Sequence, residues 1–373
     1  AMLLGDMGAD IIKVEQPGRG DDTRAWGPPF VGEESAYFLG ANRNKRSITL
    51  NLKDPAGQEI LGELLRGADV VINNFKLGTM EKFGFDDAWY GANAPQIVGC
   101  SILGYGSTGP RAGLPGYDFL LQAESGLMNI TGEADGDPMK LGVAIVDLCT
   151  GMYAMSAILA AINARHESGL GQAVEVSLYD TGVSLLANVA ANFLASGQTA
   201  GRYGNGHPNI VPYNAYPTGD GMIALSVGND MQFATFCNAV GHAEWVGDTR
   251  FARNRDRVEN RSACDGLISD LFRTGTTEAW LKKLLAAGVS CAPINTVEQA
   301  LTAAHTAARG LVTTAHHTTE GEIKIPGIPF RFSRDPASIR CAPPVLGEHT
   351  DTVLSELGKS PEDIAALRAA GTI

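Results

Sequence analysis

The residue with the clearest capacity for chemistry is Asp147, which lies in the otherwise apolar stretch Gly142–Met152. It is the only acidic or basic residue between Lys140 and Arg165. Aspartate is also a favoured N-cap residue, and a long apolar pattern begins directly after it, so from the residues alone the capping interpretation carries more weight. The two interpretations are compatible, because the positive end of a helix keeps a carboxylate ionised. An ionised carboxylate is a nucleophile at neutral pH without a partner base.

A glycine-rich motif, Gly104–Gly109, follows an apolar run and matches the GxGxxG pattern of dinucleotide-binding folds. That pattern needs a helix N-terminus directly behind it to bind a pyrophosphate. The residues behind it instead include Pro110, Gly113, Pro115 and Gly116. The downstream acid, Glu124, falls inside an apolar helical pattern and not at a strand end. The sequence therefore disfavours a nicotinamide oxidoreductase and favours a glycine-rich loop over another ligand.

Other polar groups carry weaker signals. Tyr117 and Asp118 follow the glycine-rich loop, either as the start of a helix or as groups beside the pocket of Asp147. Asn205–Tyr213 is polar and aromatic at a predicted domain boundary, where pockets often form, and a rigid linker explains it equally well. His316 and His317 form an isolated pair without metal-ligand spacing, so no metal site is predicted.

Short apolar runs alternate with helical patterns in the N-terminal half, which indicates a parallel sheet with crossover helices. The predicted strands are Ile11–Val14, Ser47–Leu52, Asp69–Ile72, Ile97–Leu103 and Ala173–Leu178. The predicted helices are Asp54–Gly67, Tyr117–Met128, Leu148–Arg165 and Thr181–Ala195. In the first of these helices, Asp54 is the expected N-cap and Pro55 the first helical residue.

The composition changes at Gly201–Tyr213 to glycine, asparagine, histidine and proline, which indicates a linker. We predict a large domain over residues 1–200, a small domain over 214–296, and a C-terminal part, 315–373, that returns to the large domain. The expected elements beyond the linker are a strand at Met222–Val227, helices at Met231–Val240, Cys264–Arg273 and Thr277–Ala287, a short hairpin at Gly321–Pro329 and a helix from Pro361 toward Ala369.

The formal net charge is −12 over 373 residues, which disfavours non-specific nucleic-acid binding because that needs a positive field. Residues 1–83 are nearly balanced, with ten Lys or Arg against twelve Asp or Glu, so a phosphate-bearing ligand fits this part best. The six cysteines form no CxxC pair, which indicates reduced thiols and a cytoplasmic location. The longest apolar run, Leu148–Ile162, is too short to span a membrane and predicts a buried helix.

Several segments together resemble the class III coenzyme A transferases, the family of formyl-CoA transferase and carnitine CoA-transferase. The matching stretches, in chain order, are Leu4–Glu15, Asn44–Ile48, Asn73–Phe75, Met80–Gly84, Gly116–Asp118, Val146–Asp147, Gly201–Tyr213, Gly228–Asp230, Pro326–Gly327 and Leu346–Thr350. Each stretch is short, but their order and spacing cover nearly the whole chain and make the resemblance specific.

The resemblance implies an α/β fold with a Rossmann-like parallel sheet in the large domain, a smaller α/β domain, and a homodimer of two chains interlocked as linked rings. The family's catalytic aspartate falls on Asp147. Residues expected at the substrate are Tyr117, Asp118, His207 and Tyr213. Contacts with CoA carry over to Leu50, Lys53, Asn74, Phe75 and Lys82, where the lysines suit phosphates as point charges.

The implied activity is transfer of CoA from an acyl-CoA thioester to a carboxylic acid. The Asp147 carboxylate would attack the donor to give a mixed anhydride, and the released thiolate would then give an aspartyl-CoA thioester, which the acceptor acid resolves in reverse. Backbone amides at the helix start are candidates to stabilise the oxyanions. No cofactor is expected to stay bound, since CoA is a substrate. The expected partners are an acyl-CoA, a small carboxylic acid and a second copy, without nucleic acid or membrane.

Three departures from the family pattern are visible. Ala1–Gly8 resembles the middle of a helix, so we expect that the family's first strand is missing from this numbering. Gln16 stands where some relatives place an arginine near the nucleotide. Gly228–Gln232 replaces the glycine-only loop of formyl-CoA transferase, which disfavours the formyl-CoA/oxalate reaction and favours a dicarboxylate such as succinate or a related acid.

Two alternatives stay open at this point. The α-methylacyl-CoA racemases of the same family use a histidine in a Gly-His-Asp context as the proton-transfer base. Tyr117 stands at that place, which argues against racemisation. The other alternative is a CoA-binding protein without catalytic activity.

Overall fold

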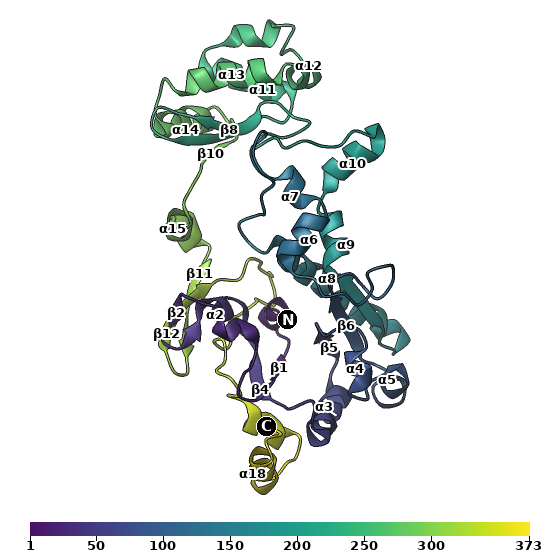
Figure 1. The fold of residues 1–373 in the computed structure, drawn as a ribbon. Helices are drawn as coiled ribbons and strands as arrows, with labels where there is room; N and C mark the ends of the chain where they lie inside the picture. The colour runs from purple at the N-terminus through teal and green to yellow at the C-terminus, as the bar shows by residue number, and fades with distance from the viewer. The chain divides into compact units, whose positions relative to one another are not determined.

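The computed structural model describes residues 1–373, a mixed α/β chain that divides into two compact units (Figure 1). The first unit comprises Ala1–Leu121, Ala144–Thr181 and Leu301–Ile373. The second unit comprises Gln122–Val143 and Gly182–Ala300. The C-terminal segment therefore belongs to the same unit as the N-terminal strands.

Parallel strands form the framework of the first unit. β1 (Ile12–Glu15) pairs with β4 (Arg46–Thr49), and β6 (Val98–Leu103) lies between β5 (Val70–Asn73) and β7 (Ala173–Ser177). Each strand begins within one residue of its predicted start. The parallel pairing is confirmed, but the strands form two sheets and not the single sheet that was predicted.

The two parallel sheets are separate because side chains, and not backbone hydrogen bonds, connect them. Leu4 of helix α1 (Met2–Asp6) and the nearby Ile11 belong to one apolar cluster with Val70 and Ile72 of β5. This cluster gives the first unit a continuous core across the two sheets.

Helix α3 (Pro55–Gly67) connects β4 to β5 and begins as predicted. The Asp54 carboxylate accepts a hydrogen bond from the Ala56 amide at 3.1 Å, and Pro55 occupies the first turn. The buried side chains of Ile60, Leu61 and Leu65 form its apolar face. Local sequence therefore determines where this helix begins and which face it buries.

Helix α8 (Ile145–Ser168) covers β6 and β7 with one face only. Ala154 and Ile158 are buried against Cys100, but Leu148 is 56% exposed, and only 28% of the helix's most apolar 18-residue window is buried. The prediction of a buried helix is therefore wrong for the single chain, because the second face has no covering element. α8 is also long and apolar enough to cross a membrane, although a single such helix is weak evidence.

The remaining elements of the first unit complete its surface. α17 (Thr350–Glu356) and α18 (Pro361–Ala369) pack Val353, Leu354 and Ile364 against Ile48 and Ile60. A hairpin joins β11 (Val312–His317) to β12 (Gly321–Pro326), so the predicted hairpin at Gly321–Pro329 supplies only its second strand. The short elements are η1 (Asp22–Ala25), β2 (Phe30–Val31), β3 (Glu34–Ser35), α2 (Ala36–Ala41), α4 (Thr79–Lys82), α5 (Asp87–Asn93), α15 (Val297–Thr302) and α16 (Ala304–Ala308), with α15 crossing the boundary between the units.

The second unit has an antiparallel sheet in the order β10 (Cys291–Pro293), β9 (Met222–Ser226), β8 (Tyr213–Pro217). The helices that accompany it are α11 (Asp230–Val240), η2 (Ala243–Gly247), α12 (Asn254–Glu259), α13 (Arg261–Phe272) and α14 (Thr277–Ala286). Phe233, Phe236, Phe272 and Trp280 form the aromatic centre of its core. The predicted strand and three predicted helices are present within a few residues, whereas β8 and β10 carried too little pattern to be predicted.

The division into units differs from the predicted domains at two segments, 122–143 and 182–200, which were assigned to the large domain. Arg202 connects the first of these segments to the second unit, because its guanidinium donates to the carbonyl oxygens of Asn129 at 3.2 Å and Glu133 at 3.1 Å. Asn192 connects the other segment, because its side-chain amide donates to the side-chain oxygen of Asn209 at 2.9 Å. These segments hold α7 (Leu127–Ile130) and α10 (Ala187–Ser196), while α6 (Asp118–Glu124) and α9 (Leu178–Ser184) cross the boundary.

Candidate active site

Asp147 lies in the first turn of α8 and does not cap it. The helix begins at Ile145, three residues earlier than an Asp147 cap requires, and Ala144 occupies the N-cap position without a side-chain hydrogen bond. The capping interpretation of Asp147 is therefore wrong. Its side chain is exposed on the first unit and remains available for chemistry.

Asp118 supplies the missing cap from another element. Its Oδ1 accepts hydrogen bonds from the amides of Val146 at 2.8 Å and Asp147 at 3.3 Å. Helix starts leave such amides without partners inside the helix, so a carboxylate placed there stabilises the first turn. Since Asp118 occupies them, these two amides are not a vacant oxyanion site, which corrects the sequence expectation.

The carboxyl of Asp147 is a weaker acid than an ordinary aspartate. Partial burial, followed by the negative charge of Asp118, raises the pKa of Asp147 to about 6. The group is therefore mostly ionised at pH 7 but protonated below pH 6. A raised pKa makes the carboxylate a stronger base than ordinary aspartate and favours covalent bond formation.

Tyr37 and Trp26 are neighbours of this site that the sequence analysis missed. Burial raises the pKa of Tyr37, and the charges of Asp147, Asp118 and Asp21 add to it, so its hydroxyl lies within electrostatic reach of both site carboxylates. The ring of Trp26 meets that of Tyr37 edge-on at 4.9 Å, and both are about half exposed. The one available signal was the pair of aromatics in a polar, proline-containing stretch between predicted strands.

Tyr117 directly precedes α6 and is the most open of the predicted substrate residues, with 69% of its surface exposed. Its carbonyl oxygen accepts the Leu121 amide at 3.0 Å, so its backbone belongs to the first turn that also carries Asp118. The predicted helix over Tyr117–Met128 is present but interrupted, because Gly126 adopts a positive φ between α6 and α7.

Three of the predicted CoA residues gather where β5 ends. The Asn74 side chain donates to the carbonyl oxygen of Ile102 at 2.7 Å, Phe75 is 40% exposed and meets Phe83 edge-on at 6.0 Å, and Lys82 is exposed at the end of α4. An exposed aromatic face beside a cation is suited to a nucleotide with phosphates.

The other two predicted CoA residues follow β4. Lys53 is exposed in the loop before α3, whereas Leu50 is 1% exposed and belongs to the core with Ile48. Leu50 can therefore offer a ligand only backbone groups. Its amide already donates to the carbonyl oxygen of Glu15 at 2.9 Å, which leaves its carbonyl oxygen for such a contact.

His207 and Tyr213 belong to the second unit, where the structure pairs them. The His207 amide donates to the carbonyl oxygen of Tyr213 at 3.1 Å, and their ring centroids lie 5.3 Å apart. The Nδ1 atom of His207 accepts the Asn209 amide at 3.0 Å. These contacts fit the linker interpretation and also present a polar, aromatic pair.

The glycine-rich loop after β6 is tied to the neighbouring strand. Glu175 of β7 accepts the Ser107 amide at 3.0 Å, and a side chain at Gly106, where φ is +83°, would approach the same carboxylate. Gly104 packs so closely against Gly116 that a Cβ would clash with backbone. No helix begins directly behind the motif, since α6 starts only at Asp118, so the helix N-terminus that a dinucleotide-binding turn places at the pyrophosphate is not found there.

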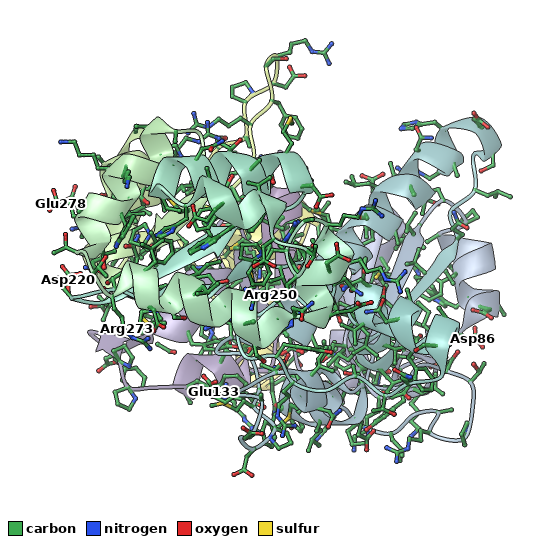
Figure 2. All side chains as sticks on the ribbon, turned by 90° about the horizontal axis from the view of Figure 1, so that it is seen from above. Asp86, Glu133, Asp220, Arg250, Arg273 and Glu278 are labelled. Atoms are coloured by element: carbon green, nitrogen blue, oxygen red, sulfur yellow. The ribbon has the colours of Figure 1, made fainter.

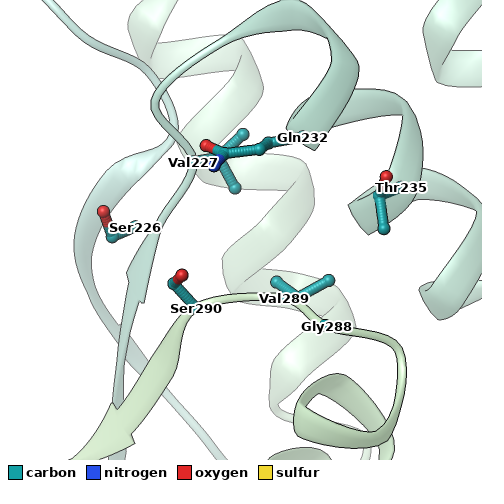
Figure 3. A pocket seen from close by; sticks show the side chains of 7 residues that line it. All are labelled: Ser226, Val227, Gln232, Thr235, Gly288, Val289 and Ser290. Carbon is teal, nitrogen blue, oxygen red and sulfur yellow. The ribbon is translucent and has the colours of Figure 1, made fainter.

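Two cavities lie within the units, and both are away from these residues. A cavity of about 40 Å³ in the second unit is lined by Ser226, Gln232 and Ser290 among others (Figure 3). A more open one, of about 570 Å³, lies beside Met7 and residues 332–335 of the first unit. Neither is lined by a predicted site residue. No group of three or more His, Cys, Asp or Glu side chains could hold a metal ion.

Comparison with known proteins decides the family. Residues 1–350 match the model of CoA-transferase family III. The chain belongs to CoA-transferase family III. A crystal structure of a CAIB/BAIF family protein from Brucella suis shares the fold with a TM-score of 0.82 and 42% identity, covering 95% of this chain and 93% of that one.

Two curated relatives of this family III protein are similar over almost their whole length. It is 42% identical over 373 residues to succinyl-CoA:glutarate CoA-transferase of Mus musculus, covering 100% of this chain and 86% of the relative. It is 44% identical over 368 residues to succinate–glutarate CoA-transferase of Agrobacterium fabrum, covering 95% and 90%. The protein is therefore an enzyme, a class III acyl-CoA:carboxylate CoA-transferase.

Proposed function

We propose that this CoA-transferase moves CoA between two dicarboxylic acids, from succinyl-CoA to glutarate or a similar acid, through a covalent intermediate on Asp147. The observation that carries the covalent step is the placement of Asp147, an exposed carboxylate of raised pKa held at the first turn of α8. The activities of the two relatives, both transferases between succinate and glutarate, support the choice of acids.

The proposed reaction balances without a cofactor. An Asp147 carboxylate oxygen attacks the donor carbonyl carbon, the C–S bond breaks, and a mixed anhydride and CoA thiolate result. The thiolate attacks the Asp147 carboxyl carbon, which releases the donor acid and leaves an aspartyl-CoA thioester. The acceptor carboxylate displaces the thiolate to form a second anhydride, and the thiolate then attacks the acceptor's carbonyl carbon. Each step exchanges one acyl bond, which lowers the barrier of the whole transfer.

Two substrate contacts are part of the proposal. CoA would bind along the carboxyl ends of β4 and β5. Lys53 and Lys82 would contact its phosphates. Phe75 and Asn74 would lie beside the nucleotide, and Leu50 would contribute backbone groups only. Tyr117 would lie beside the acyl group, and Asp118 would act there indirectly, through the helix start that it caps. His207 and Tyr213 stay candidates for substrate contact within the second unit.

Intact-protein mass spectrometry tests the covalent step. Wild-type protein mixed with succinyl-CoA should gain the mass of CoA less water after release of succinate, and Asp147→Ala should gain none. The same adduct on Asp147→Ala would overturn the assignment. Comparing glutarate with pentanoate as acceptors tests the need for a second carboxylate, and equal rates would contradict the dicarboxylate proposal.

A racemase is the competing function within the family. Incubating an α-methylacyl-CoA in deuterated water distinguishes them, because a racemase exchanges the α-proton whether or not an acceptor acid is present. We expect no exchange. Appearance of deuterium at the α-carbon, without CoA transfer to an added acid, would favour the racemase.

We also propose that the two parallel sheets belong to a Rossmann-like arrangement. A second proposal is that two chains form an interlocked dimer. The apolar face of α8, with Leu148, Met152 and Leu159 exposed, supports a second chain as its cover. Linked rings cannot separate by dilution, so the dimer mass should persist in sedimentation velocity from micromolar to nanomolar concentration. A monomer at the lower concentration would refute interlocking.

A further inference from the structure

We propose that Asp118 is the positioning residue of the nucleophile: its carboxylate fixes the first turn of α8 and acts on the reaction through Asp147, without contacting the substrate. This inference rests on the proposed covalent role of Asp147. It replaces the expectation that Asp118 is a direct substrate contact.

The start of α8 has no local means to satisfy its backbone. Ala144 at the N-cap position has no hydrogen-bonding side chain, and the helical ladder begins with the Leu148 amide, which donates to Ala144 at 3.0 Å. The amides before it need acceptors from elsewhere. Asp118, 28 residues upstream at the start of α6, accepts the amides of Val146 and Asp147 with a single oxygen.

One of those two amides belongs to the nucleophile itself. A hydrogen bond at 3.3 Å from the Asp147 amide to Asp118 therefore restrains the backbone from which the reacting carboxylate extends. Holding a nucleophile in one orientation removes entropy cost from the transition state. Removing the acceptor would leave two polar amides unpaired, and the first turn would then fray.

The charge of Asp118 opposes the charge of Asp147. Tyr37 on α2 is within electrostatic reach of both carboxylates, and Asp21, whose charge Lys13 compensates at 2.6 Å, also acts on Tyr37. Two causes raise the pKa of Asp147: burial, which is the larger, and the negative charge of Asp118. The cap thus keeps the nucleophile basic, which a neutral cap such as serine would not do.

A direct role in binding the acceptor acid fits these contacts less well. An ionised carboxylate only accepts hydrogen bonds, and an acid substrate arrives as an anion that also only accepts. Two anions in one pocket repel each other. The backbone amides are the partners that Asp118 matches in chemistry and in distance.

Two substitutions separate the positional and the electrostatic parts. Asp118→Asn keeps an oxygen acceptor without charge, and Asp118→Ala removes both. In Asp118→Asn, the acid limb of kcat should move to lower pH by on the order of half to one unit, because the like charge is gone. In Asp118→Ala, the same shift should come with a further loss of kcat, on the order of tenfold, at little cost in KM.

Hydrogen exchange gives a readout that does not depend on activity. Exchange in peptides covering residues 144–150 should accelerate in Asp118→Ala and much less in Asp118→Asn. The matched control is Asp220→Asn at the surface of the second unit (Figure 2), where Asp220 accepts the Thr277 amide at the start of α14 at 2.7 Å. That variant should change neither the acid limb nor exchange over 144–150.

An acid limb that stays in place in both Asp118 variants, or unchanged exchange over 144–150 in Asp118→Ala, would overturn the inference. A rise in KM for the acceptor acid alone would restore direct substrate binding. If wild-type protein forms no adduct at all, the proposed function fails instead, and hydrogen exchange still decides whether Asp118 holds the helix.

Discussion

Asp54 and Asp147 stand at two helix starts in the same unit, and their sequences predict the same role for both. At α3 the prediction is confirmed, and Asp54 caps the helix that follows it. At α8 it is wrong, because the helix begins before Asp147 and takes its cap from Asp118. The difference teaches that a carboxylate released from local capping is available for chemistry.

The electrostatics of the two aspartates differ in the same sense. Hydrogen bonds from Thr372 and from the Ala56 amide lower the pKa of Asp54 below its ordinary value. Burial and Asp118 raise the pKa of Asp147 to about 6. The fold therefore stabilises the anion of Asp54, whereas it destabilises the anion of Asp147 and so makes that carboxylate more basic.

The largest effect should come from Asp147→Asn. The substitution preserves shape but removes the proposed nucleophile, so transfer between two acids should fall on the order of a thousandfold or more. Steady-state rates of acyl-CoA formation measure this, and circular dichroism controls for the fold. If Asp147→Asn transferred CoA at near the wild-type rate, Asp147 would have no more chemical role than the capping residue Asp54.

The pH profile of the wild type should show the raised pKa directly. Since protonation blocks attack, kcat should fall about tenfold per pH unit below pH 6 and level off above pH 7. Measurement of kcat between pH 4.5 and 8 with saturating substrates checks this. A fall of kcat only below about pH 4 would show that the carboxyl of Asp147 titrates like an ordinary aspartate and would contradict its raised pKa.

Tyr37→Phe tests whether the neighbouring phenol assists Asp147. A phenol is protonated at neutral pH, and the pKa of Tyr37 lies above its ordinary value because of burial and the nearby carboxylates, so its hydroxyl can donate to an oxyanion beside them. We expect kcat to fall roughly tenfold with KM little changed. A Tyr90→Phe control removes a phenol from α5, and an equal loss in that variant would make the effect non-specific.

The smallest effects concern stability and have opposite signs. Because the pKa of Asp54 is lowered in the fold, its anion stabilises the protein above the unfolded pKa, and this is lost on acidification. Asp54→Ala should therefore lower the melting temperature by a few degrees at pH 7 and less near pH 3.

The raised pKa of Asp147 works the other way. Its protonated form fits the fold better, so its contribution to stability declines as pH rises from the unfolded value of 3.8 through about 6. Asp147→Asn should raise the melting temperature at pH 7 and leave it unchanged near pH 3. The rise should be small, because water screens the charge of a group this exposed. A fall at pH 7 would contradict the sign.

Elements with local signals were predictable from the sequence. The strands around β5 and β6 and the helix after Asp54 needed only apolar pattern and cap residues. The split of the parallel strands into two sheets was not, because pairing depends on contacts between distant segments. For the site, resemblance identified Asp147, whereas the Asp118 cap and the approach of Tyr37 depend on tertiary structure that no local pattern encodes.

The bond from the Ser107 amide to Glu175 has a practical consequence for engineering. It anchors the loop behind β6 at one point, so that the turn acts as a stiff extension of the sheet. Residues 110–113, beyond this anchor, are exposed or nearly so, and substitutions there should leave the strands of the sheet in place. Replacing Glu175 first would forfeit that freedom, since every later change would then act on a loosened scaffold.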